Sequence, residues 1–166
     1  VQELLGEVHK LLPDTELWLG GPEVSFECHA ILEKYPYVKG IMIGEGEETF
    51  LALLRYYLKE GEQSLEDIPG LALSTGYTTE RDLVNLSQVP FLYSAGNADK
   101  LNDFEHRIIY YESSRGCPFR CSYCLSSIDK KVRLRDIELV KKELQFFLDH
   151  KVPQVKFIDR TFNCNH

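Results

Sequence analysis

The sequence predicts an α/β protein with parallel sheets, organised in two parts. Short apolar strands alternate with amphipathic helices in residues 1–84, and the same alternation returns in residues 107–166. The residues between them contain Pro90, Gly96 and scattered polar side chains, without a sustained hydrophobic period. We therefore expect one domain at 1–84, a linker at 85–106 and a second domain at 107–166.

The first part opens with an apolar helical stripe that Pro13 stops, because proline cannot continue a helix. Residues 17–19 and 38–43 are apolar runs that predict two strands, and the helix between them is expected to end near Tyr35. A third helix is expected to follow residue 48. Its predicted apolar face consists of Phe50, Leu51, Leu54, Tyr57 and Leu58.

A hairpin is predicted to complete the first part. Residues 71–75 form one extended run, Gly76 and Tyr77 are interpreted as the turn, and a second strand is expected near residues 78–84. This hairpin would cover an edge of the first sheet.

The second part has the pattern of a β-loop-α-β unit. Residues 108–112 are β-branched and aromatic, which favours a strand, and residues 113–116 break it. A helix is expected to begin at Arg135 and Asp136, and residues 154–158 alternate as a second strand. The apolar positions of the helix are Ile137, Val140, Leu144, Phe147 and Leu148. This order predicts a parallel sheet or a (β/α) barrel, whose functional groups collect at the carboxyl ends of the strands.

Three cysteines lie between the two strands of this unit. Cys117, Cys121 and Cys124 have the spacing CxxxCxxC within one short loop. Soft thiolates select Zn²⁺, Cu(I) or iron-sulfur clusters over hard cations. The single loop favours an iron-sulfur cluster, for which three thiolates leave a four-iron cluster one ligand short.

Two other interpretations of these cysteines stay open. A zinc site would be completed by Cys164 or His166, because zinc accepts Cys₃His and Cys₄ ligand sets. Structural zinc sites, however, usually pair their ligands in knuckles separated by a longer loop. The third interpretation is a set of buried structural thiols, although a free cysteine usually enters a core singly as a small apolar residue.

The cysteine loop resembles that of the radical S-adenosylmethionine (radical SAM) enzymes, whose fold is a partial (β/α)₆ barrel. The resemblance implies that the three cysteines hold three irons of a [4Fe-4S] cluster, and that SAM binds the fourth iron. It implies contact of Tyr123 with the adenosine of SAM, and it places Asp159 and Thr161 in the region that helps bind the SAM amino group. The reduced cluster would then cleave SAM to a 5′-deoxyadenosyl radical. The Gly-Gly-Glu motif that is usual in the family is absent from this sequence. From the residues alone, Asp159 could equally cap the end of a strand.

Residues 1–84 resemble the carboxy-terminal half of the Rossmann-like (flavodoxin-like) cobalamin (B12)-binding domain that precedes many radical SAM domains. The resemblance rests on a Gly-Gly-Pro turn at residues 20–22 and a Gly-Glu-Gly-Glu turn at residues 44–47. The same combination occurs in proteins similar to anaerobic Mg-protoporphyrin IX monomethyl ester oxidative cyclases and in cobalamin-dependent radical methylases. It implies that residues 107–166 are the truncated start of a radical SAM barrel.

Many cobalamin-binding domains supply a lower axial histidine from an Asp-x-His-x-x-Gly loop, which this sequence lacks. We interpret all five histidines as surface or cap residues: His9, His29, His106, His150 and His166. Cobalamin is therefore implied only for the parent protein. A metal- or cobalamin-binding module without radical catalysis is the alternative function.

The composition is typical of a soluble globular protein, with 43% hydrophobic residues and a net charge of -7. The acidic excess argues against nucleic acid as a main partner. No apolar run reaches the ~20 residues that cross a membrane, and there is no secretory signal pattern, so we expect a cytoplasmic protein. A local basic cluster either forms a solvated surface or contacts an anion or an electron donor. It consists of Lys130, Lys131, Arg133 and Arg135.

The chain begins at Val1 within a helical pattern and stops at His166, just after the second barrel strand. We expect a fragment of a radical SAM Fe-S oxidoreductase with cyclase- or methyltransferase-like chemistry on a small-molecule substrate, served by a reducing electron donor. The fragment is expected to be inactive alone, because most of the barrel is missing. Unpaired strands would leave an apolar edge and predict self-association.

Overall fold

The computed structural model describes residues 2–60, 64–93, 108–127 and 131–162. The chain divides into two compact units, Val1–Val84 and Asn85–His166, and each is described here by itself. The two predicted zinc ligands Cys164 and His166, and also His106, lie outside the described residues.

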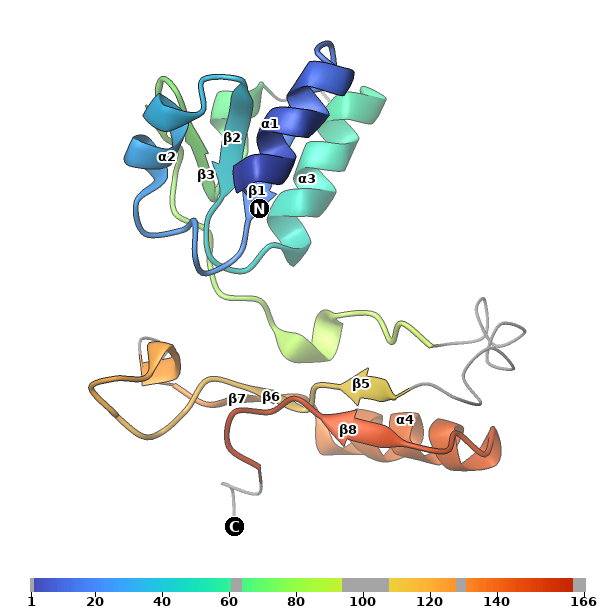
Figure 1. Ribbon diagram of the computed structural model, residues 1–166. Helices are drawn as coiled ribbons and strands as arrows, with labels where there is room; N and C mark the ends of the chain where they lie inside the picture. The colour runs from blue at the N-terminus through green and yellow to red at the C-terminus, as the bar shows by residue number, and fades with distance from the viewer. Residues whose placement is uncertain (1, 61–63, 94–107, 128–130, 163–166) are drawn as a thin grey trace. The chain divides into compact units, whose positions relative to one another are not determined.

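The first unit is built around a four-stranded mixed sheet (Figure 1). Its elements in chain order are α1 (Gln2–Leu11), β1 (Leu17–Gly20), α2 (Cys28–Lys34), β2 (Val38–Met42), α3 (Glu47–Leu58), the 3₁₀ turn η1 (Leu65–Asp67), β3 (Leu71–Leu73) and β4 (Gly76–Tyr77). The strand order is β1-β2-β3-β4, with β1 and β2 parallel and the other neighbours antiparallel. The predicted alternation of helices and parallel strands is confirmed for β1 and β2.

Two hydrophobic clusters cover opposite faces of this sheet, because successive residues of a strand point to opposite sides. On one face, Ile41 and its cross-strand partner Ala72 pack with Leu32 of α2. On the other face, the flanking residues Leu71 and Leu73 pack with α3. The sheet is therefore buried on both sides, as an α/β architecture requires.

The hairpin forms, but its predicted turn is wrong. Residues 74 and 75 make the turn, while Gly76 and Tyr77 are the returning strand β4. Gly76 has a φ of 137°, which glycine adopts easily because it has no Cβ. The glycine therefore allows the chain to leave the turn and enter β4. Beyond β4 the pairing continues, since the backbone N–H of Thr78 donates to the carbonyl of Leu71 at 2.9 Å.

Helix α3 presents its predicted apolar face to solvent. The side chains that the helix buries are Thr49 and Leu53, which lie on the opposite side. Phe50 is 52% exposed and Leu58 is 67% exposed. The helix is thus apolar on two sides, and periodicity alone could not tell which side packs on the sheet.

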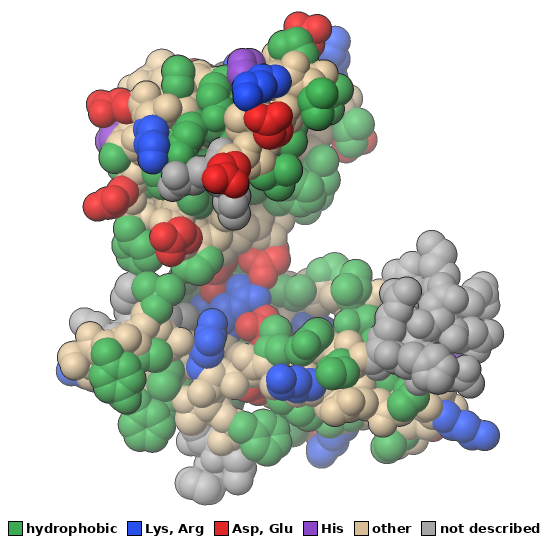
Figure 2. Space-filling model, in the orientation of Figure 1, with side chains coloured by type: hydrophobic (Ala, Val, Ile, Leu, Met, Phe, Trp, Pro, Cys, Tyr) green, Lys and Arg blue, Asp and Glu red, His purple; other side chains and the backbone are tan. Residues whose placement is uncertain are grey.

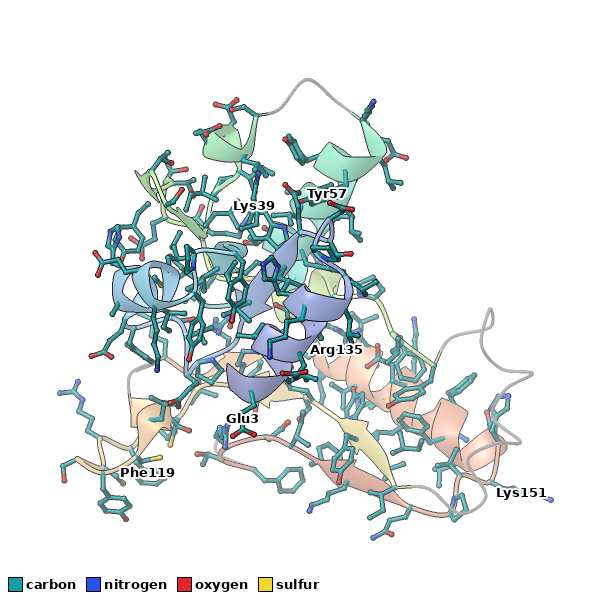
Figure 3. The ribbon with its side chains drawn as sticks, turned by 45° about the horizontal axis from the view of Figure 1, so that its top comes forward. Glu3, Lys39, Tyr57, Phe119, Arg135 and Lys151 are labelled. Carbon is teal, nitrogen blue, oxygen red and sulfur yellow. The ribbon has the colours of Figure 1, made fainter. Side chains whose placement is uncertain are left out.

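A polar network links α3 to β1 and β2. Tyr57 donates a hydrogen bond to Glu16 and accepts one from Trp18 Nε1 at 2.8 Å, while Lys39 pairs with Glu16 at 2.8 Å (Figure 3). Burial of the phenol, and then its hydrogen bond to Glu16, raise the pKa of Tyr57 to about 12. The folded protein therefore holds this proton more tightly than the unfolded chain does.

Replacing Tyr57 with phenylalanine should lower stability at pH 8, and the deficit should shrink as the pH rises from 10 towards 12. The folded pKa is raised above the unfolded value near 10, so the tyrosine's contribution is fully present below pH 10 and is lost above it. Urea unfolding of both proteins at pH 8, 10 and 11.5 measures the difference. A deficit that stays constant across this range would contradict the expectation.

The second unit contains a parallel strand pair covered by one long helix (Figure 1). Its elements are the 3₁₀ turn η2 (Leu86–Gln88), β5 (Ile109–Tyr111), β6 (Ser114–Arg115), the 3₁₀ turn η4 (Leu125–Ser127), β7 (Arg133–Leu134), α4 (Ile137–Asp149) and β8 (Val155–Phe157). Strands β5 and β8 are parallel, and β6 pairs with β7 in antiparallel fashion. The predicted β-loop-α-β unit is confirmed, within a mixed α/β structure.

Helix α4 begins where the sequence predicts it. Asp136 is the N-cap, and its carboxylate accepts hydrogen bonds from the backbone N–H groups of Glu138 and Leu139 at 3.0 and 3.1 Å. Val140 and Phe147 are buried against β5 and β8, as their spacing predicts. Ile137 and Leu148, which belong to the same predicted stripe, are 61% and 70% exposed.

Arg135 is a core residue, which corrects its assignment to a basic surface cluster. Its guanidinium pairs with Glu143 at 2.5 Å, and the two side chains are 8% and 7% exposed. Tyr111 also donates to Glu143 at 2.6 Å. The hydrogen bond to Glu143 raises the pKa of Arg135. Burial raises the pKa of Tyr111, and the hydrogen bond that Tyr111 donates to Glu143 raises it further. The Glu143 carboxylate therefore accepts hydrogen bonds from both the guanidinium and the phenol, which offsets the cost of burying its charge.

The described start of the predicted linker, residues 85–93, packs onto the second unit. Arg135 donates to the carbonyl of Leu86, and Phe91 and Tyr93 pack edge-on against Phe147. This segment supplies aromatic surface to the core formed by β5, β8 and α4.

Among the residues that the structure describes, none of the helices has the length and apolar character needed to cross a lipid bilayer.

Candidate functional site

The cysteine loop connects the two strands of a small hairpin, β6 and β7 (Figure 1). This pairing corrects the prediction that residues 113–116 only break a strand. Local pattern could not reveal it, because Ser114 and Leu134 meet across the whole cysteine loop. Buried Gly116, with a φ of 96°, turns the chain from β6 into the loop.

The three cysteines share the features of accessible ligand thiols. Cys117, Cys121 and Cys124 are half-buried and are not in disulfides. The backbone N–H of Cys124 donates to the carbonyl of Cys121 at 3.1 Å, so the CxxC end of the motif forms a tight turn. Three reduced thiols on one loop match the donor chemistry of an iron-sulfur cluster.

Large apolar side chains on the same loop are exposed to solvent. Tyr123 is 91% exposed, Phe119 62% and Leu125 54%. Figure 3 shows Phe119 projecting from the loop that carries the sulfur atoms, and Figure 2 shows hydrophobic side chains gathered over the same loop. Side chains of this kind grouped at a surface mark an interaction or ligand site.

The segment after β8 contacts the cysteine loop at Cys117 and the residues after β5 at Ser113. The hydroxyl oxygen of Thr161 lies 3.2 Å from the sulfur of Cys117. The carboxylate of Asp159 accepts hydrogen bonds from the backbone N–H of Ser113, at 2.8 Å, and from the Ser113 hydroxyl. Parallel strands end at the same edge of a sheet, so β5 and β8 bring these residues together. The contact matches the strand-end role that the sequence left open for Asp159.

A cavity of about 530 Å³ lies beside this junction. Apolar side chains of α4 and β8 form much of its wall, and Asp159 and Thr161 belong to its lining. Ser114 also lines it; its hydroxyl is buried and has no hydrogen-bond partner within the described part of the chain. The junction therefore combines one thiol, several hydroxyls and one carboxylate beside a largely apolar cavity.

Within the described ranges, no three His, Cys, Asp or Glu side chains converge closely enough to hold a single metal ion. A [4Fe-4S] cluster does not require the three thiolates to converge on one point, because each of them binds a different iron. Three thiols on one loop are the donor type that such a cluster needs.

The two glycine turns of the first unit are tied together by a serine. The Ser25 hydroxyl donates to the carbonyl of Gly21 at 2.8 Å and accepts from the backbone N–H of Gly44 at 3.2 Å. Both glycines have positive φ values, 101° and 71°. A cavity of about 330 Å³ opens beside the second turn, with Thr78 and Arg81 in its lining.

Two of the residues that organise these sites, Ser113 and Ser25, were not predicted as site residues from the sequence. Ser113 lies just beyond the carboxyl end of β5, after Glu112, and a polar residue at that place was a usable signal. Ser25 lies in an irregular segment before α2, where no local pattern marks a residue that bridges two turns.

Each described histidine contacts an aromatic ring. His9 stacks on Tyr37 with ring centroids 4.5 Å apart, His29 meets Tyr77 edge-on at 4.8 Å, and the His150 ring lies 4.0 Å from that of Phe146. These contacts agree with surface or cap roles.

No family model matches this chain. Curated relatives are nevertheless similar over most of it. An uncharacterized methyltransferase of Pyrococcus horikoshii, PH0819, is 29% identical over 89% of this chain and 34% of its own length. The cobalamin-dependent radical SAM methyltransferase TokK of Streptomyces tokunonensis is 28% identical over 93% of this chain and 24% of its own length. The anaerobic magnesium-protoporphyrin IX monomethyl ester cyclase of Cereibacter sphaeroides is 26% identical over 87% of this chain and 25% of its own length. The chain thus spans about a third or less of the length of these relatives.

Solved structures share the fold. The cobalamin-dependent radical SAM enzyme OxsB, with aqua-cobalamin and SAM bound, matches 97% of this chain and 24% of its own, with a TM-score of 0.72 and 22% identity. The radical SAM methyltransferase TsrM of Kitasatospora setae, with cobalamin and a [4Fe-4S] cluster bound, matches 98% of this chain and 33% of its own, with a TM-score of 0.65 and 19% identity. The predicted resemblance to radical SAM proteins with a cobalamin-binding domain is confirmed. The cofactors bound in these neighbours are the three that the sequence resemblance implied.

Proposed function

We propose that this chain is the part of a cobalamin-dependent radical SAM enzyme that binds the [4Fe-4S] cluster and begins the SAM site. Cys117, Cys121 and Cys124 are the proposed cluster ligands. The observation that carries the proposal is the position of the cysteine loop, which meets the carboxyl end of the parallel β5 and β8 pair through Cys117 and Thr161. Functional groups of βα-barrel proteins collect at that edge.

The bound and reduced cluster would supply the electron that cleaves SAM to a 5′-deoxyadenosyl radical. The protein's part is to bind and orient. Exposed Tyr123 offers an aromatic face to the adenosine, and Thr161 offers a hydroxyl oxygen to the SAM amino group. Asp159 holds the segment after β8 against Ser113, which places Thr161 beside Cys117.

The finer division of the fold belongs to the same proposal. We assign the first unit to the carboxy-terminal half of a Rossmann-like cobalamin-binding domain and the second to the first βα unit of a partial (β/α)₆ barrel. The parallel pairs β1–β2 and β5–β8 support this division. Cobalamin would contact the glycine turns that Ser25 joins, where close backbone approach needs glycine.

The parent enzyme would act on a small-molecule substrate and receive electrons from a reducing donor, with methyl transfer or ring closure as its chemistry. The curated relatives include methyltransferases and cyclases, which supports an enzymatic role. We propose that turnover requires the rest of the barrel and that the exposed apolar face of α3 promotes self-association.

Anaerobic reconstitution with iron and sulfide tests the proposal. We expect about four irons and four sulfides per chain, and an EPR spectrum of the reduced sample that changes when SAM is added. The control is the same sample with adenosine and methionine added separately, which lack the sulfonium. Zinc uptake without a cluster would instead indicate a metal-binding module. A cluster whose spectrum ignores SAM would remove the SAM site from the proposal.

A further inference from the structure

We infer that Thr161 is a positioning residue that donates a hydrogen bond to the Cys117 sulfur and thereby raises the reduction potential of the cluster. The inference rests on the proposed function, because it requires Cys117 to be a cluster ligand. This role of Thr161 concerns the reduction potential of the cluster and is separate from the binding of SAM.

The starting observation is the 3.2 Å contact between Thr161 Oγ1 and Cys117 Sγ. In the free thiol either atom can be the donor. A cysteine that binds iron does so as a thiolate and has no proton to give. Ligation therefore fixes the direction of the bond, and the Thr161 hydroxyl must donate to the sulfur.

The threonine is held in place from both sides. Two residues before it, Asp159 is bonded twice to Ser113, at the end of β5. One residue after it, the Phe162 ring packs edge-on against Phe157 of β8, with centroids 5.1 Å apart. The β-branched side chain of threonine also restricts its first torsion angle. These contacts hold the backbone on both sides of Thr161 and so keep the residue close to Cys117.

A hydrogen bond to a ligand sulfur favours the more negative state of a cluster. Reduction adds an electron, part of whose charge is carried by the sulfur ligands, so a donor at Cys117 makes reduction easier. A hydroxyl has one proton and two lone pairs. Donation to the sulfur leaves the Thr161 oxygen able to accept from the SAM amino group, so the two roles are compatible.

Three variants of the 166-residue chain separate the hydrogen bond from packing. Thr161→Val keeps the branched shape without a donor, Thr161→Ala also lacks the donor, and Thr161→Ser retains it. Each is reconstituted anaerobically, assayed for iron and sulfide, and titrated against redox mediators with EPR detection. We expect the equilibrium constant for one-electron reduction to fall about tenfold in the valine and alanine variants, which corresponds to a potential about 59 mV more negative. The serine variant should match the wild type.

The outcomes distinguish the two proposals. A wild-type chain that holds no cluster would overturn the proposed function, and with it this inference. Clusters in all proteins with one shared potential would overturn the inference alone. A fall in the serine variant equal to that in the valine variant would also overturn it, because loss of shape and not loss of a donor would then be the cause.

Discussion

Replacing Cys121 with serine is expected to abolish cluster binding, with iron per chain falling from about four to well below one after reconstitution. Cys121 is the central cysteine of the CxxxCxxC motif and one of the three proposed cluster ligands. A serine hydroxyl is a hard donor that stays protonated, whereas iron-sulfur clusters need soft thiolates. Iron, sulfide and the visible absorbance of the reconstituted sample measure the loss.

Cys28 provides the matched control. It is also a thiol, but it is 1% exposed, donates to the carbonyl of Val24 at 3.3 Å and lies in the core of the first unit. Burial raises the pKa of its thiol, which makes it a poor ligand. Cys28→Ala should therefore retain full iron content. Equal iron loss in both variants would show that the assay reports unfolding and not ligation.

Replacing Arg135 with leucine is expected to destabilise the second unit by about 3–5 kcal/mol, the cost of leaving a buried charge without its partner. Glu143 would remain among apolar groups with only the Tyr111 hydroxyl to satisfy it. The bond that fastens Leu86 to the unit would be lost as well. Urea unfolding followed by circular dichroism measures the change.

Two controls identify the cause. The double variant Arg135→Leu with Glu143→Leu should recover most of the stability, because no unpaired charge is then buried. Lys141→Ala removes a cation from an exposed pair on the same helix, where Lys141 and Glu138 lie 2.7 Å apart, and should change stability by less than about 1 kcal/mol. A double variant as unstable as the single one would point to lost packing.

Local signals in the sequence were sufficient for several elements. The Asp136 cap placed the start of α4, and the apolar runs around Leu19 and Ile41 placed two strands. These features depend on neighbours within a few residues, so short-range physical chemistry determines them. The cysteine spacing likewise indicated a soft metal site without any knowledge of the fold.

Tertiary structure decided the features that depend on distant partners. Both sides of α3 are apolar, and only packing on the sheet selected Leu53 for burial over Phe50. In the sequence Arg135 looks like a surface cation, but in the structure its side chain is buried and paired with Glu143 of α4. The sequence alone predicted a chain that combines a cysteine loop with βα units. The approach of Thr161 to Cys117 came only from the pairing of β5 with β8, because contacts between residues far apart in sequence depend on the whole fold.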